Sequence, residues 1–262
     1  MNPFAAQPTP LDVRFRLFGT PVSIHPFFWL AALWLGWDLS GGVWRKVLTF
    51  IVALCVSMLV HEFGHALMAR VFRTPAHILI LPFGGAAMID ADRLRGWQRV
   101  CIYLAGPAAG FALYAAVKWG AEPWFHAWIT QNAQALGDQT KTIIRGLFDF
   151  IMLMALFYNV VNLLPIYPLD VGQVVREILL GIFPSRGVQL SCGLSFLLAA
   201  GIAVYSLLKM QGRPLWYPPL DPTFTMVIFG IMALQNFIMM MAPPRPASGQ
   251  RDEQRDDATA AV

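Results

Sequence analysis

Charged residues are scarce in this 262-residue chain, where Asp, Glu, Lys and Arg make up 13% of the residues and hydrophobic residues make up 57%. Soluble globular domains carry about 25% charged residues, so this composition excludes an ordinary soluble fold. The charges that are present lie mainly between long apolar runs, which is the pattern of a polytopic membrane protein.

Cysteine is scarce as well. Cys55, Cys101 and Cys192 fall in three different predicted membrane helices, and no two of them have CxxC spacing. The sequence therefore indicates neither a disulfide framework nor a thiolate zinc site. We interpret the three cysteines as packing residues.

A basic face is lacking too, although the net charge is +4. Lys and Arg lie in loops that flank apolar segments, so no nucleic-acid partner is expected. With six spans, the loops on the side of the N-terminus hold 12 of the 19 Lys and Arg residues, and the other side holds 7. The positive-inside rule therefore predicts cytoplasmic termini, and we expect the protein in a prokaryotic plasma (inner) membrane.

The apolar runs predict an all-α polytopic membrane protein with about six transmembrane helices and a small membrane-associated β element. The predicted spans are 27–39, 47–69, 97–119, 146–164, 188–208 and 223–241. A loop is predicted at 120–145. The spans form one integral-membrane domain over residues 11–242, which we expect to lie between a mobile arm at 1–10 and a disordered tail at 243–262. The arm shows no cleavage signature, so we expect it to be retained.

Two short segments do not fit spanning helices. Residues 11–24 alternate polar and apolar up to a turn at 19–21, which predicts an amphipathic hairpin at the membrane surface. Residues 76–89 are apolar and β-branched but are broken by a proline and two glycines, which predicts a re-entrant strand or hairpin. Irregular backbone at membrane depth is tolerated where it lines a cavity, so we interpret this segment as a cavity wall.

One stretch, His61-Glu62-Phe63-Gly64-His65, places three ionisable residues in an otherwise apolar predicted helix. On a helix, His61 and His65 leave one face about one turn apart, which is the spacing that puts two imidazoles on one Zn²⁺. Glu62 is rotated by about 100° and can reach a water beside the metal. The alternative is a polar patch satisfied by neighbouring helices. A charge at mid-helix costs about 2.5–3.5 kcal/mol, so such residues are functional by default.

A catalytic zinc ion needs a third protein ligand and an open position. Asp170 is the best candidate, because two prolines break the helix before it and turn its carboxylate back toward the bundle. Asn159 and Asn162, in the preceding span, could stabilise an oxyanion or simply tie helices together. We favour the catalytic role for Asn162 and leave Asn159 open. His25, before the first span, is interpreted as an interfacial histidine.

Four motifs together resemble the site-2 protease family of intramembrane zinc metalloproteases. They are HEFGH at 61–65, PFGG at 82–85, AGP at 105–107 and NLLPIYPLDVG at 162–172. The resemblance covers most of residues 13–241. Two positions depart from it, since many members have glycine at Val171 and asparagine at Gly110. With no sequence for a PDZ or CBS domain, we expect a core-only member.

The resemblance implies a zinc metalloendopeptidase that cleaves within or near a transmembrane segment of a membrane-protein substrate, as in regulated intramembrane proteolysis. It implies that one Zn²⁺ per chain is bound by His61, His65 and Asp170. Glu62 would then be the general base, and Asn162 would help to position or polarise the scissile carbonyl.

The expected partners are a transmembrane protein substrate and the lipid bilayer, and the oligomeric state stays open. A substrate helix must unwind before cleavage, and strand addition could hold the unwound stretch. The residues expected to do so are Ile78, Leu79, Ile80, Leu81, Gly84 and Gly85. A zinc transporter and a catalytically silent membrane scaffold are the alternative functions.

Overall fold

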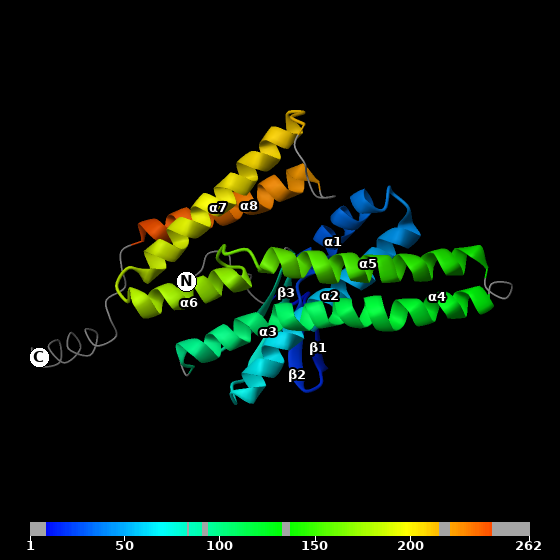
Figure 1. The fold of residues 1–262 in the computed structure, drawn as a ribbon, viewed down its shortest axis with the longest axis horizontal. Coiled ribbons are helices and arrows are strands. Elements are labelled where there is room, and N and C mark those ends of the chain that lie inside the picture. Colours follow the sequence, from blue (N-terminus) through cyan, green and yellow to red (C-terminus); the bar gives the residue numbers. More distant parts are fainter. Residues whose placement is uncertain (1–8, 83, 91–93, 133–136, 215–220, 243–262) are drawn as a thin grey trace, which may run out of the picture.

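The computed structural model describes residues 9–82, 84–90, 94–132, 137–214 and 221–242 (Figure 1). The predictions of an arm and a tail fall mainly on residues 1–8 and 243–262, which lie outside the described residues. In chain order the elements are β1 (Val13–Leu17), β2 (Thr20–Ile24), α1 (Pro26–Leu39), α2 (Trp44–Val71), β3 (Ala76–Leu81), β4 (Gly84–Ile89), α3 (Gly96–Ala115), η2 (Ala116–Ala121), α4 (Glu122–Gln131), α5 (Asp138–Asn162), α6 (Asp170–Ile182), α7 (Gly187–Met210) and α8 (Pro222–Met241).

Within the described part of the chain, five helical stretches are long and apolar enough to cross a membrane. They are Trp44–Val71, Gly96–Gln131, Thr140–Asn162, Gly187–Met210 and Pro222–Met241. The remaining predicted span is α1, which has 14 residues and is therefore about 21 Å long, shorter than a bilayer core of about 30 Å. The predicted helical membrane fold with a small β element is confirmed.

The predicted loop at 120–145 is wrong over much of its length. The helix of α3 continues through η2 and α4 to Gln131, and α5 already begins at Asp138, so two long helices lie side by side (Figure 1). Pro123 lies at the start of α4, directly after the π-helical turn of η2, and its missing N–H interrupts the hydrogen bonding of the continuous helix there. The π-helical turn of η2 accommodates this interruption, so the helix continues into α4.

The four strands form one sheet in the order β1-β2-β3-β4. Both predicted hairpins are present, because β1 pairs antiparallel with β2 and β3 pairs antiparallel with β4. A parallel pairing of β2 with β3 joins the two hairpins. β3 therefore has β4 on one side and, at residues 78–80, β2 on the other. The strand addition expected at Ile78–Leu81 is corrected accordingly, because these residues are already paired. The outer edge of β4 has no partner strand among the described residues.

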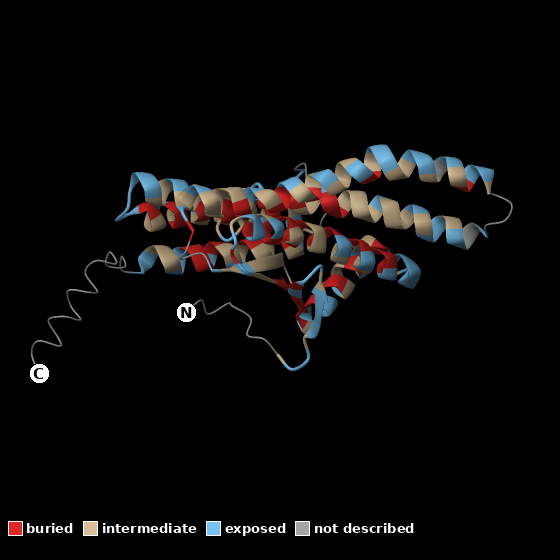
Figure 2. Cartoon of the chain, turned by 90° about the horizontal axis from the view of Figure 1, so that it is seen from below, coloured by how far each residue is buried: buried red, intermediate tan, exposed pale blue. Residues whose placement is uncertain are grey.

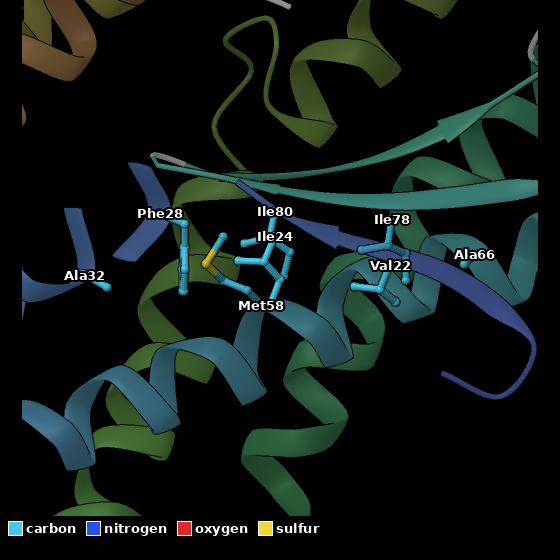
Figure 3. Packing of buried hydrophobic residues seen from close by; sticks show 8 residues of the cluster. All are labelled: Val22, Ile24, Phe28, Ala32, Met58, Ala66, Ile78 and Ile80. Carbon is cyan, nitrogen blue, oxygen red and sulfur yellow. The ribbon is translucent and has the colours of Figure 1, made fainter. Parts of the chain in front are cut away.

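The sheet packs on α2 through one face, which positions the helix that carries the histidine motif. Alternate residues of β2 and β3 point toward α2, as the period of two requires. The buried residues of this layer are Val22, Ile24, Phe28, Ala32, Met58, Ala66, Ile78 and Ile80 (Figure 3). Burial is concentrated in the middle of the molecule, whereas the ends of α4 and α5 beyond the middle are mostly half-buried or exposed (Figure 2).

Small residues bring α2 and α3 into close contact. A Cβ at Gly64 would collide with the main-chain oxygen of Ala105 and with the Cβ of Ala109. Membrane helices lack a hydrophobic driving force for association and rely on such close packing. The glycine of the histidine motif therefore sets the distance between these two helices.

The loop before α6 is held by α7 and α8. The main-chain N–H of Tyr167 donates to Ser195 Oγ at 2.9 Å, and Asn236 Nδ2 donates to the Tyr167 oxygen at 2.6 Å. Ile166, beside it, is buried in an apolar cluster with residues of α7 and α8. Two helices thus fix the backbone three residues before Asp170.

We predict that Gly64→Leu lowers the thermal unfolding midpoint of the detergent-purified protein, because the added side chain must push α3 away from α2. Overpacking of this kind costs about 1–3 kcal/mol. Gly201→Leu on α7 is the matched control, since a Cβ there meets no atom within 4 Å. Equal midpoints for the two variants would contradict the close contact.

Candidate metal centre

Three ligand-type side chains meet inside the helical bundle. His61 and His65 lie one turn apart on α2, and Asp170 is the first residue of α6. All three are buried, with exposed fractions of 1%, 4% and 6%. The backbone at Leu169 is extended, so α6 begins abruptly at the aspartate. A helix N-terminus carries partial positive charge, which stabilises the Asp170 carboxylate there.

The potential ligand atoms form a small triangle. Nε2 of His61 lies 3.1 Å from Nε2 of His65 and 3.0 Å from Oδ2 of Asp170. Nε2 of His65 lies 3.3 Å from Oδ1 of Asp170. Ligand atoms of a tetrahedral zinc ion, at about 2.0–2.1 Å from the metal, are about 3.3–3.4 Å apart. The observed spacing therefore fits zinc with little movement of the side chains.

Each imidazole is held through its second nitrogen. Nδ1 of His61 lies 2.8 Å from Asn159 Oδ1, and Nδ1 of His65 lies 2.7 Å from the main-chain oxygen of Ile102. Because both partners are acceptors, we assign the proton to each Nδ1, which leaves a lone pair on each Nε2 facing the centre. The Asn159 amide is itself oriented, since its Nδ2 donates to the Ala155 oxygen.

Two glycines of α3 make room for these groups. A Cβ at Gly106 would collide with the His65 ring, and a Cβ at Gly110 would collide with the Asn159 amide. In the structure, their missing side chains let α3 close over one ligand and over the residue that holds the other.

Unpartnered carboxylate oxygens indicate that a cation belongs here. Oε2 of Glu62 and Oδ2 of Asp170 are buried and accept no hydrogen bond from the residues that the structure describes. Although His61 Nε2 is near Oδ2, with its proton on Nδ1 it has none to donate. Buried carboxylates without partners are costly, and a divalent cation would neutralise them. Two imidazoles and one carboxylate are a ligand set of catalytic zinc sites, with one position left open.

Glu62 lies beside the ligand group and faces a strand. Its Oε1 is 4.0 Å from His61 Nε2 and 3.4 Å from the Tyr158 hydroxyl. β4 runs directly against this carboxylate, because a Cβ at Gly85 would collide with it. The Gly85 N–H in turn donates to the Tyr158 hydroxyl at 3.0 Å. A potential base, an edge strand and a hydroxyl group thus meet on one side of the ligands.

Comparison with known proteins shows the family to which the chain belongs. A model of peptidase family M50 matches residues 49–202, which is more than half of the chain. The chain belongs to peptidase family M50. The fold of this M50 chain is similar to the solved structure of the site-2 protease from Methanocaldococcus jannaschii, with a TM-score of 0.58 and 20% identity over 90% of this chain and 98% of that one.

Two curated relatives of this M50 chain cover most of its length. Stage IV sporulation protein FB of Bacillus subtilis is 29% identical over 195 residues, which make up 72% of this chain and 59% of that protein. A zinc metalloprotease of Methanocaldococcus jannaschii is 29% identical over 204 residues, 75% of this chain and 54% of that protein. The chain thus spans only a little over half the length of these relatives. The predicted resemblance to the site-2 protease family is confirmed.

Two other candidate residues of this M50 chain have local contacts. Asn162 Nδ2 donates to the main-chain oxygen of Tyr158 at 2.9 Å, one turn back in α5, so its catalytic role stays a prediction. His25 caps α1, since its Nδ1 accepts from the N–H of Phe27 at 3.3 Å. Sequence reasoning missed Tyr158 and left Asn159 open. In the sequence, the one indication of a role for Tyr158 and Asn159 is that these two polar residues lie next to each other in an apolar span.

We predict about one zinc per purified wild-type chain and its loss in Asp170→Ala and His65→Ala, because each variant lacks a ligand. Asn159→Ala keeps every ligand but frees the His61 ring, and loss of such a support lowers metal affinity about 10–100-fold. Elemental analysis and chelator competition measure both effects.

Asn162→Ala is the matched control for Asn159→Ala, since its amide donates within its own helix. Zinc that persists in Asp170→Ala would mean that the third ligand lies elsewhere. Equal zinc affinity of Asn159→Ala and the wild type would show that the His61 ring needs no support from α5.

Proposed function

We propose that this chain is an intramembrane zinc metalloendopeptidase, which hydrolyses a peptide bond within or near a transmembrane segment of a membrane-protein substrate. One observation carries the proposal: the buried group of His61, His65 and Asp170, with the unpartnered Oε2 of Glu62 beside it, lies among helices long enough to cross a membrane. Membership of family M50 supports it, as does the relative named zinc metalloprotease.

Peptide hydrolysis needs a proton carrier, and Glu62 is placed to be one. Zinc, when bound by the three ligands, polarises the scissile carbonyl and makes a water molecule more acidic. Glu62 accepts a proton from this water while the water oxygen bonds to the carbonyl carbon. As the C–N bond breaks, Glu62 returns that proton to the leaving amine. Asn162 is assigned to positioning or polarising the carbonyl.

The outer edge of β4 is proposed to hold the substrate. Gly85 is paired with Ile80 of β3, yet its N–H donates to Tyr158. Opposed residues in an antiparallel pair alternate between hydrogen-bonded and non-hydrogen-bonded pairs. The N–H and C=O groups of Gly85, Ala87 and Ile89 are therefore assigned to the outer edge. An unwound substrate segment can pair with them.

Strand addition at β4 would bring the substrate to the base. Gly85 lets β4 approach the Glu62 carboxylate, so a paired segment passes close to that group. The substrate-binding role expected for Ile78–Leu81 therefore moves to β4, where Gly84 and Gly85 begin the strand. Pairing also satisfies the backbone groups that a substrate helix exposes when it unwinds in the membrane.

We assign cytoplasmic termini in a prokaryotic plasma membrane to the arrangement in which α1 also crosses the membrane as a short span, since the side of the N-terminus then holds 12 of the 19 Lys and Arg residues. His61 then lies about 12 Å of helix before Ala69, near the cytoplasmic end of α2. Cleavage at this depth would release the cytoplasmic part of a membrane-anchored substrate. This outcome is the one that regulated intramembrane proteolysis requires.

The ligand arrangement favours hydrolysis over the alternatives. A transporter needs ligand groups at successive depths, whereas the described residues contain one group of three or more His, Cys, Asp or Glu that could hold a metal. A silent scaffold has no use for a base beside the ligands, and Glu62 lies there with an unpartnered oxygen.

We predict that Glu62→Gln binds zinc like the wild type but cleaves a membrane substrate about 10²–10⁴-fold more slowly, because it lacks the proton acceptor. Glu122→Gln on α4, which loses an ion pair with Lys118, is the matched control and retains turnover. Turnover in Glu62→Gln close to that of the control would rule out Glu62 as the base.

We predict that Ala87→Pro raises KM about 3- to 10-fold without changing zinc content, because proline lacks the N–H that a substrate strand needs from this edge. Ala87→Val keeps the N–H and serves as the matched control. The difference in KM between the two variants gives the contribution of the backbone N–H at position 87. An unchanged KM in the proline variant would place the substrate away from β4.

A further inference from the structure

Tyr158 on α5 contacts three parts of the site and has no role in the hydrolysis described above. Its ring packs edge-on against the ring of His61, with centroids 4.9 Å apart. Its hydroxyl oxygen accepts the Gly85 N–H at 3.0 Å, and the same oxygen lies 3.4 Å from Glu62 Oε1. One hydroxyl group therefore links the edge strand to the base.

The two contacts of this hydroxyl group differ in strength. The bond from Gly85 has the ordinary length of an N–H···O hydrogen bond, whereas 3.4 Å is long for donation from a hydroxyl group to a carboxylate. The hydroxyl is thus held mainly by the strand, and Glu62 receives little from it. The bond from Gly85 uses a lone pair and leaves the hydroxyl proton available, but it fixes the oxygen 3.4 Å from Glu62 Oε1. Any group that takes the Gly85 N–H away would let this oxygen move closer to Glu62.

A substrate strand would bring such a group. When a strand adds to the outer edge of β4, its carbonyl oxygens accept the outward N–H groups, including that of Gly85. The Tyr158 oxygen occupies the position that a substrate carbonyl oxygen would take. The hydroxyl and the substrate therefore compete for one donor.

We propose that Tyr158 is a positioning residue. In the free protein its hydroxyl oxygen accepts the Gly85 N–H, and when a substrate carbonyl oxygen replaces it there, the hydroxyl moves to hydrogen-bond with Glu62. Its hydroxyl then donates to Oε1 at full strength and fixes the carboxylate, with Oε2 left to accept the proton of water. Substrate binding in the correct register thereby orients the base. This inference rests on the proposed peptidase function and on strand addition at β4.

The first test separates binding from turnover with Tyr158→Phe, which keeps the ring against His61. The probe is a fluorogenic transmembrane peptide of about 25 residues with glycine and proline at its centre. We expect kcat to fall about 10- to 100-fold, the range for losing one hydrogen bond to a charged group. KM stays equal or falls, because the competitor for Gly85 is gone. Zinc content is unchanged, and Tyr114→Phe, on α3, is the matched control.

A raised KM with intact kcat would overturn the proposal, because Tyr158 would then help to bind the substrate and would not yield to it. Loss of zinc in Tyr158→Phe would also overturn it, since the hydroxyl would then be needed to keep the metal centre intact and would not act on the base. A fall in kcat equal to that of Tyr114→Phe would overturn it too, because the effect would then not be specific to Tyr158.

A second test needs no cleavage. The chain has two Gly–Gly steps, 41–42 and 84–85, so glycine labelled with ¹³C at the carbonyl and with ¹⁵N gives two coupled amide signals, from Gly42 and Gly85. In the Glu62→Gln background, Tyr158→Phe should shift the Gly85 signal and leave Gly42 in place. Adding the peptide should bring Gly85 to the same position with and without the tyrosine hydroxyl.

The two measurements distinguish failure of the proposed Tyr158 exchange from failure of the proposed peptidase function. A peptide that moves Gly85 to the common position but is not cleaved by the wild type would count against the peptidase and leave the exchange standing. A Gly85 signal that the peptide does not move, or that keeps different positions in the two variants, would overturn the exchange.

Discussion

The hydrogen bonds on the far sides of the two imidazoles determine much of the arrangement around them. A membrane interior provides no water to satisfy a buried N–H, so Nδ1 of each histidine must find an acceptor on another helix. For His61 this acceptor is Asn159 of α5, and for His65 it is Ile102 of α3. The requirement ties α2 to both neighbours at the depth of the site. Because each Nδ1 is bonded in this way, the Nε2 atoms of both histidines face the candidate metal centre.

The third ligand comes from a different part of the molecule. The loop before Asp170 is bonded through Tyr167 to Ser195 of α7 and Asn236 of α8, while the histidines are held by α3 and α5. The candidate metal centre therefore joins two packing units. A cation there would neutralise the Asp170 carboxylate and link the C-terminal helices to the histidine-bearing helix.

Local patterns in the sequence predicted the parts of the fold that depend on neighbouring residues. Apolar run length located α2, α7 and α8, and helical spacing placed His61 and His65 on one face. Alternation and turn residues located both hairpins. The parallel pairing of β2 with β3, which closes the β3 edge, joins segments that are distant in the chain, and no local pattern specifies it.

The parts that escaped prediction depend on tertiary partners. The continuation of α3 into α4 crosses Gly120 and Pro123, residues that usually end a helix but here lie in a π-helical turn and directly after it. Tyr158 and Asn159 acquire their roles only through Gly85 and His61, which other elements bring to them.

The collision at Gly110 has a consequence for how sequences of this kind can vary. A side chain there and the amide of Asn159 occupy the same space, so the two positions are not independent. A larger residue at 110 fits only if 159 becomes smaller, and the acceptor that His61 needs must then be supplied from α3. Substitution of either position alone weakens the site, whereas a paired exchange can move the amide from one helix to the other and preserve it.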